Sequence, residues 1–284
     1  MAKSLQSDYE QIVKESERLF KSLDRSGRKE YAALLKSVRA EVSEVYAKYA
    51  DKEGVLTYAE MQKFNRIKSL KQNIDDIVKT HTQTVQTQLT SVLKDDIRQS
   101  YSQSMSIIGD AAGISLNGKM QAEAISAILK KPAEGWTITE RMVLRQRDLA
   151  VRLQGVVTNG FVHGDSLQDA AKAIKTTIEK DFARFRSFAG DTAHRVSQEA
   201  VSESIKSAGK EADIKVIKVW VTAGDDRVRE AHALLDGQEV RGDENFIIPS
   251  GEFAGYQADA PQGFGEPALD YGCRCRIVAD VVKR

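Results

Sequence analysis

The chain has 284 residues, 41% of them hydrophobic, and its 42 basic and 41 acidic side chains give a formal net charge of +1. Nine Phe, eight Tyr and two Trp provide apolar surface for a core, which excludes a wholly disordered chain. The charge balance argues against a dedicated nucleic-acid-binding protein, which normally carries a large positive excess. Two cysteines are too few for a disulfide framework. The sequence contains no run of about 18 apolar residues, so no membrane-spanning helix is expected.

The N-terminal half predicts long amphipathic helices. Ser7 and Glu10 form a capping-box pattern that opens a helix reaching Leu23. A break is expected at residues 24–27, Asp-Arg-Ser-Gly, followed by a second amphipathic run over residues 31–49. Neither stripe can be buried alone, so the two runs are expected to pack as an antiparallel hairpin. The polar N-terminus lacks the apolar centre of a signal peptide, which predicts a protein made and used in a cytoplasm.

The next segments also predict helices. A capping box at Thr57 and Glu60 opens the longest pattern, which runs to Gly109, with a kink expected in its threonine-rich centre at residues 79–91. A short helix is expected near residues 121–129. A third capping box, at Thr137 and Glu140, begins a helix that ends near residue 159. Two further helices are expected over about 166–178 and 181–208, the first capped by Asp165 or Ser166.

The character of the chain changes near residues 209–213. Residues 214–221 and 273–282 are rich in β-branched side chains and predict strands. Between them lie a short helix over 227–235, a turn at Asp236-Gly237 and a glycine-rich loop over 251–265. The expected fold class is mainly α, with long N-terminal helices in a hairpin or bundle and a small α+β C-terminal module. We expect an elongated helical interaction region over 1–160 and a second domain over 161–284, with helices at 165–208 and α+β structure at 212–284.

The C-terminal 65 residues carry an ordered set of motifs. A strand ending in Trp220 is followed by two acids, two arginines, a histidine, an Asp-Gly turn and a final Cys-Arg-Cys segment. This set resembles the Mu F-like minor head protein family, the phage head morphogenesis proteins, and the resemblance covers about residues 160–284. The positions that match are Trp220, Asp226, Arg227, Arg229, His232, Asp236, Gly237, Cys273, Arg274 and Cys275.

The resemblance implies a structural protein rather than an enzyme. It implies a minor capsid protein that enters the procapsid and associates with the portal, and that accompanies DNA during packaging or ejection. The implied partners are the portal protein, a capsid or scaffold protein and phage DNA, with no membrane. The implied location is the head interior of the virion, and the host cytoplasm during assembly. Alternative hypotheses are a zinc- or thiol-dependent, toxin-like C-terminal module and a non-specific DNA-binding protein.

The polar residues of the motif allow several interpretations. The preferred one is a structural network, formed by Asp225 and the motif residues, in which Arg227 or Arg229 binds an acid through two hydrogen bonds. No cofactor is then needed. A zinc site is the alternative: Cys273 and Cys275 would face one side of a strand, and His232 with Asp225 or Asp226 would complete the ligands. A Cys-His-Asp nucleophile is a third. The candidate DNA contacts are Arg141, Arg145, Arg147 and Arg152. The alternative is that these arginines form a solvated helix face without a binding role.

Overall fold

The computed structural model describes residues 2–133 and 135–282, and it confirms the expected fold class: long helices precede a C-terminal part with short antiparallel strands. The chain forms two compact units. The first comprises Met1–Lys21, Ser91–Ile138 and Ala189–Arg284, and the second comprises Ser22–Thr90 and Thr139–Phe188. The chain passes from one unit to the other within its long helices. The domain boundary expected at residue 160 lies instead at the point where the resemblance to the family begins.

The first helix, α1 (Ala2–Tyr49), is continuous. The hairpin expected from a break at residues 24–27 is therefore wrong, and Ser7 lies inside the helix rather than at its start. Gly27 serves close packing instead of a turn, because a Cβ atom there would lie 3.3 Å from the ring of Phe185. Asp24 is held within the helix by Arg28, one turn further on.

The second helical stretch has its interruption at the start rather than in the centre. Thr57 caps the short helix α2 (Tyr58–Gln62) by accepting from the amide of Glu60, as expected. In the 3-10 turn η1 (Lys63–Asn65), Phe64 and Asn65 have φ angles of 54° and 60°, which separates α2 from α3 (Arg66–Ala112). The threonines of α3 cause no interruption, since their hydroxyls donate to carbonyls one turn back, as in Thr82 to Val78 at 2.7 Å.

The remaining helices are α4 (Ala122–Lys130), α5 (Ile138–His163) and α6 (Leu167–Ala212). Ser166 caps α6 by accepting from the amide of Asp169 at 3.2 Å. The two helices expected over 166–178 and 181–208 are one helix. Nothing near residue 180 breaks it, because Asp181 is buried there and bound by side chains of other helices. None of the helices in residues 2–133 and 135–282 combines the length and apolar character that a membrane crossing requires.

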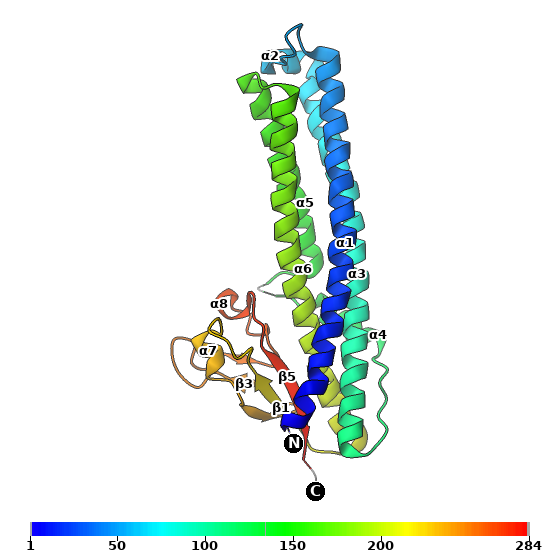
Figure 1. The fold of residues 1–284 in the computed structure, drawn as a ribbon, viewed down its shortest axis with the longest axis vertical. Coiled ribbons are helices and arrows are strands. Elements are labelled where there is room, and N and C mark those ends of the chain that lie inside the picture. Colours follow the sequence, from blue (N-terminus) through cyan, green and yellow to red (C-terminus); the bar gives the residue numbers. More distant parts are fainter. Residues whose placement is uncertain (1, 134, 283–284) are drawn as a thin grey trace. The chain divides into compact units, whose positions relative to one another are not determined.

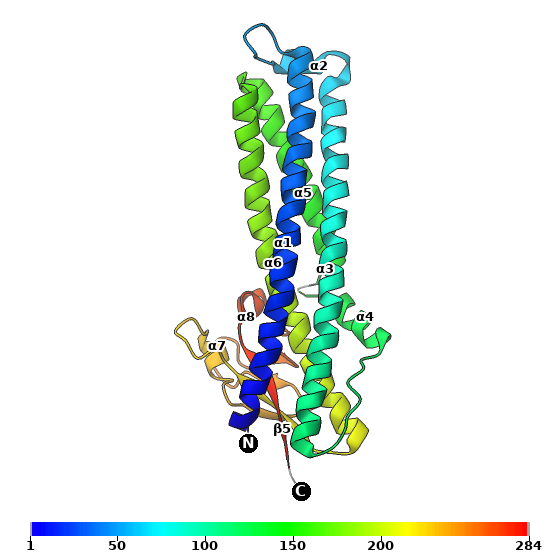
Figure 2. The same cartoon turned by 45° about the vertical axis from the view of Figure 1, so that its right-hand side comes forward.

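The second unit is a bundle of helical segments. Parts of α1, α3, α5 and α6 run alongside one another in both views (Figures 1 and 2). The rings of Tyr31, Phe182 and Phe185 pack together between α1 and α6, with Tyr31 and Phe182 centroids 5.0 Å apart. The stripes that the sequence presents on α1 and α3 are thus buried within the bundle, with Leu34, Val38, Ile74 and Val78 at most 1% exposed.

The first unit joins helical segments to a sheet. Strand β1 (Val216–Val221) lies between β2 (Glu239–Arg241) and β5 (Arg276–Val281), and both pairings are antiparallel. A second small sheet pairs β3 (Phe246–Ile247) with β4 (Gln257–Ala258). The short helices α7 (Glu230–Ala233) and α8 (Pro267–Asp270) lie in the connections. The start of β5 lies beside α1, where Arg276 binds Glu10 at 3.1 Å (Figure 1).

Candidate functional site

Trp220 is the packing centre of the C-terminal module. It lies on the central strand β1 and is 0% exposed. Three rings surround it, with centroids at 5.2 Å for Phe246, 5.7 Å for His232 and 5.9 Å for Phe264. The aromatic contacts bring the loop-rich segments between β1 and β5 onto the sheet. Trp220 therefore organises the motif residues rather than offering a platform for a ligand.

The Asp236-Gly237 turn is fixed to the end of β1. Asp236 accepts hydrogen bonds from the amide and hydroxyl of Thr222 at 2.8 and 2.9 Å, and the amide of Gly237 donates to the carbonyl of Trp220 at 2.8 Å. Gly237 has a φ of 75°, a left-handed conformation that favours glycine. The structure thus brings these motif residues together, and their hydrogen bonds hold the turn against the end of β1.

The acid that binds an arginine through two hydrogen bonds is Asp225, but its partner is Arg274 rather than Arg227 or Arg229. The two N–O distances are 2.6 and 2.7 Å. The Arg274 guanidinium lowers the pKa of the Asp225 carboxyl to about 2. Arg229 donates instead to the carbonyl of Tyr271. Asp226 and Arg227 are exposed at the surface of the loop.

The other side of the same segment forms a buried thiol and imidazole cluster. Cys273 and Cys275 lie just before β5 rather than on it, yet their side chains still share one face, opposite Arg274. Nδ1 of His232 is 3.5 Å from Sγ of Cys273 and 3.4 Å from Sγ of Cys275. All three residues are at most 4% exposed, and both cysteines are free thiols.

The two thiols have opposite pKa shifts. A hydrogen bond to Cys275 and burial raise the pKa of Cys273, whereas the hydrogen bond from Cys273 lowers the pKa of Cys275. Cys275 is therefore the thiol of this pair that loses its proton more readily. A nucleophilic thiol also needs access for its substrate, and the burial of both side chains argues against that alternative.

Three further side chains fix the backbone of the cluster, and the sequence did not identify them. Nε2 of His194, on α6, donates to the carbonyl of Cys275 at 2.8 Å. Gln262 donates to the carbonyl of Cys273 at 3.3 Å, and Gln198 accepts from the amide of Ile277 at 2.9 Å. His194 lies in a segment that the sequence predicted only to be helical. Its position on α6 gives no sign of a partner 81 residues further along the chain.

A buried lysine is a second feature that the sequence missed. Lys218, on the central strand, has a side chain that is 0% exposed and binds Asp259 at 2.5 Å. Asp259 also binds Lys206 at 2.7 Å and Ser202 at 2.7 Å. Burial lowers the pKa of Lys218. These contacts connect β1, α6 and the glycine-rich loop, and removal of either buried charge would leave its partner unpaired.

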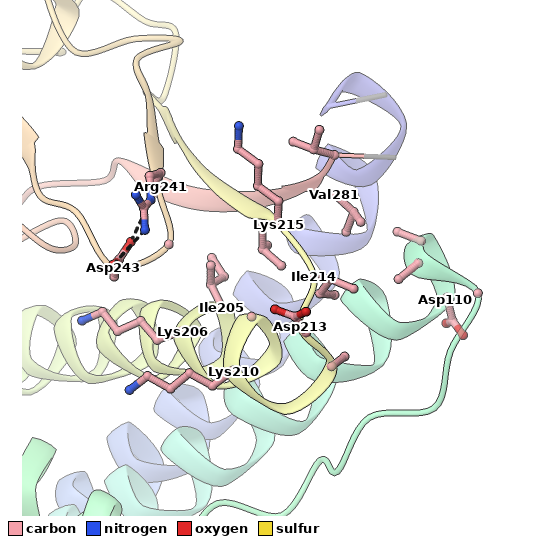
Figure 3. A pocket seen from close by; sticks show the side chains of 18 residues that line it. Asp110, Ile205, Lys206, Lys210, Asp213, Ile214, Lys215, Arg241, Asp243 and Val281 are labelled. Atoms are coloured by element: carbon pink, nitrogen blue, oxygen red, sulfur yellow. Dashed lines mark hydrogen bonds and ion pairs between the residues drawn. The ribbon is translucent and has the colours of Figure 1, made fainter. Parts of the chain in front are cut away.

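A pocket of about 1430 Å³ lies at the other end of β5, near Val281 and away from the thiols. Figure 3 shows Lys206 and Lys210 extending from α6 and Arg241 turned towards Asp243, which it binds at 3.4 Å. Its lining residues include acids and bases but no cysteine or histidine. It therefore lies apart from the motif and offers no defined set of catalytic groups.

The four candidate DNA-contact arginines lie on α5, in the second unit. Arg145 and Arg152 both bind the buried Asp181, at 3.4 and 2.7 Å. Arg152 also binds Asp148. Arg147 is exposed, and Arg141 is half-buried. Two of the four charges are therefore neutralised inside the protein, and a DNA-binding role for this set stays a prediction.

The architecture defines a mainly helical protein with a loop-rich C-terminal module arranged around Trp220. Residues 152–278 match the family described as Phage Mu protein F like protein, and this segment contains the whole motif. This match confirms the resemblance to the Mu F-like family that the motif indicated.

Two curated proteins are similar to this chain over most of its length. Minor head protein GP7 of Bacillus phage SPP1 is 25% identical over 251 residues, which are 88% of this chain and 79% of that protein. The NAD(+)–arginine ADP-ribosyltransferase EFV of Enterococcus faecalis (strain ATCC 700802 / V583) is 23% identical over 231 residues. That match covers 81% of this chain but only 46% of the transferase. No solved structure is significantly similar to the chain.

Proposed function

We propose that the chain is a structural minor head protein that enters the procapsid through an association with the portal protein. The observation that carries the proposal is the similarity to a minor head protein over 88% of this chain and 79% of that protein. The site supports a structural role, because most of its motif residues hold loops and strands together. We propose no enzymatic activity, and the location is the head interior after assembly in the host cytoplasm.

The structure offers a surface for such an association. The stripes of α1 and α3 are buried within the bundle, but α5 keeps an exposed apolar stripe formed by Leu144, Val151 and Val162. These residues are 43%, 66% and 60% exposed. They are seven and eleven residues apart, close to two and three helical turns, so they share one side of the helix. An apolar helix face of this kind fits a hydrophobic groove on a partner.

Replacing Leu144 and Val151 together by glutamate should weaken binding to the portal protein at least about tenfold, because two apolar contacts are lost and two charges are placed in the interface. Procapsids assembled with this variant should contain correspondingly little of it. Pull-down with purified portal protein and quantitative immunoblots of procapsids measure these two effects. The far-UV circular dichroism should be unchanged, since both side chains are exposed.

The matched control is the double replacement of Ala33 and Ala40 by glutamate. These residues are also exposed and seven positions apart, on α1 of the same unit. We expect normal binding and incorporation for this control. Normal incorporation of the Leu144 and Val151 variant would contradict the proposal that the exposed stripe of α5 binds the portal protein. A portal protein that fails to bind the wild-type chain would contradict the portal association itself.

DNA is a further partner of the proposed role, and Arg147 is the exposed candidate contact. Binding through phosphate contacts should weaken steeply as the salt concentration rises. Fluorescence anisotropy with double-stranded DNA at increasing salt measures this dependence. Affinity that is insensitive to salt, or unchanged in an Arg147→Glu variant, would remove DNA from the set of partners.

A further inference from the structure

Three metal-binding side chains converge in the buried cluster of the C-terminal module. Nδ1 of His232 and the Sγ atoms of Cys273 and Cys275 all lie within 4.8 Å of one another. The residues come from α7 and from the segment before β5, which are about 40 residues apart in the chain. Among residues 2–133 and 135–282, His232, Cys273 and Cys275 form the one group of three or more His, Cys, Asp or Glu side chains whose ligand atoms lie this close together.

The distances match those of a tetrahedral zinc site. With Zn–S and Zn–N bonds of about 2.3 and 2.05 Å, a tetrahedral angle places the nitrogen about 3.6 Å from each sulfur. The observed separations from Nδ1 of His232 are 3.5 Å to Cys273 and 3.4 Å to Cys275. We propose that His232, Cys273 and Cys275 bind a zinc ion as its three protein ligands.

Each ligand is already held in place by a neighbour. The His232 ring packs against Trp220 and Phe264, with centroids 5.7 and 5.8 Å away. The carbonyl groups of Cys273 and Cys275 accept from Gln262 and His194. Such outer contacts orient the ligands of metal sites and reduce the reorganisation that binding requires.

Charge and burial are compatible with the ion. Two thiolates and one Zn²⁺ make a neutral centre with the imidazole, so the buried cluster need not hold a net charge. The acids considered as further ligands are engaged elsewhere or exposed: Asp225 binds Arg274, and Asp226 lies at the loop surface. A water molecule would occupy the fourth position, as in other zinc sites with three protein ligands.

The site would serve the fold of the module. Between β1 and β5, the described regular elements are only two to four residues long. A metal that joins α7 to the chain before β5 closes this long loop at both ends. Metal binding of this kind contributes directly to the free energy of folding.

The test uses the purified full-length chain and zinc alone. After incubation with zinc and removal of the excess, elemental analysis should find one zinc ion per chain. Replacement of the zinc by cobalt should give thiolate-to-cobalt charge-transfer bands and the visible bands of a tetrahedral site. The chain has only two cysteines, so the charge-transfer bands report on Cys273 and Cys275 alone.

The variants are Cys273→Ser, Cys275→Ser and His232→Gln, and each should lose most of the zinc. The matched control is His163→Gln, an exposed histidine at the end of α5, which should keep one zinc ion per chain. The cobalt spectrum of the wild-type chain does not depend on whether any variant folds. A folded wild-type chain with less than about one-fifth of a zinc ion and no tetrahedral cobalt bands would overturn the proposal.

Discussion

Replacing Asp181 by alanine should lower the free energy of unfolding by about 3 kcal/mol, because it leaves two arginines without their buried counter-charge. Asp181 lies within the first third of α6, and its side chain is 3% exposed. It accepts from Tyr31 at 2.8 Å and from Arg152 at 2.7 Å, and Arg145 binds it at 3.4 Å. The single carboxylate therefore joins α1, α5 and α6 within the second unit.

The measurement is urea denaturation followed by far-UV circular dichroism. Both tryptophans, Trp136 and Trp220, belong to the first unit, so their fluorescence follows that unit separately. We expect the lower free energy of unfolding of Asp181→Ala to appear in the urea curve that is followed by the helical circular dichroism signal. A smaller loss is expected for Asp181→Asn, which keeps the size of the side chain and an oxygen that can accept from Tyr31.

The matched control is Asp148→Ala. Asp148 binds the same Arg152 at 2.8 Å, but its side chain is 59% exposed. An exposed ion pair contributes little, so the control should change the free energy of unfolding by less than about 0.5 kcal/mol. Equal effects of the two replacements would show that burial of the carboxylate does not determine its contribution.

Asp181 also illustrates why helix ends were harder to predict than helices. The periodic apolar stripes predicted helical structure over most of the first 212 residues, and the structure has it there. The breaks expected near residues 24–27 and 178–181 are absent. At Gly27 the small residue allows the Phe185 ring to approach, and at Asp181 the charge is bound by other helices. Both reasons are tertiary contacts, which a local pattern does not contain.

The candidate site shows the same division. The motif indicated the segments of the candidate site, and the structure brings Trp220, His232, Cys273 and Cys275 together. The hydrogen-bond and ion-pair partners of the motif side chains could not be predicted, because they depend on the three-dimensional path of the loops. Arg274 rather than Arg229 binds Asp225, and the buried Lys218 lies at a strand position where a charged side chain normally faces solvent.

Asp96 is expected to make the first unit less stable as the pH rises from about 4 to 7. This residue of α3 is 1% exposed, and its partners are hydroxyl groups rather than a cation: Ser16 of α1 at 2.8 Å and Ser100 at 3.3 Å. Ser100 in turn binds Ser197 of α6 at 2.8 Å. Burial raises the pKa of Asp96 from 3.8 to about 7.

The direction follows from which state binds the proton more tightly. Between pH 4 and 7 the folded chain holds a proton on Asp96 that the unfolded chain has released, so a rise in pH favours unfolding. The stabilisation is fully present below pH 4 and is lost as the pH rises to 7. A shift of about three pKa units corresponds to at most about 4 kcal/mol of unfolding free energy.

The Asp96→Asn variant removes this ionisation and keeps a side chain of the same size. At pH 8 it should be more stable than the wild-type chain by up to about 4 kcal/mol, and the difference should vanish near pH 4. Tryptophan fluorescence in urea, measured from pH 4 to 8, follows the unit that contains Asp96. The neighbouring Asp95→Asn is the matched control, because that side chain is 57% exposed and should show no such pH-dependent difference. A constant difference between Asp96→Asn and the wild-type chain at all these pH values would mean that the buried carboxyl does not titrate in this range.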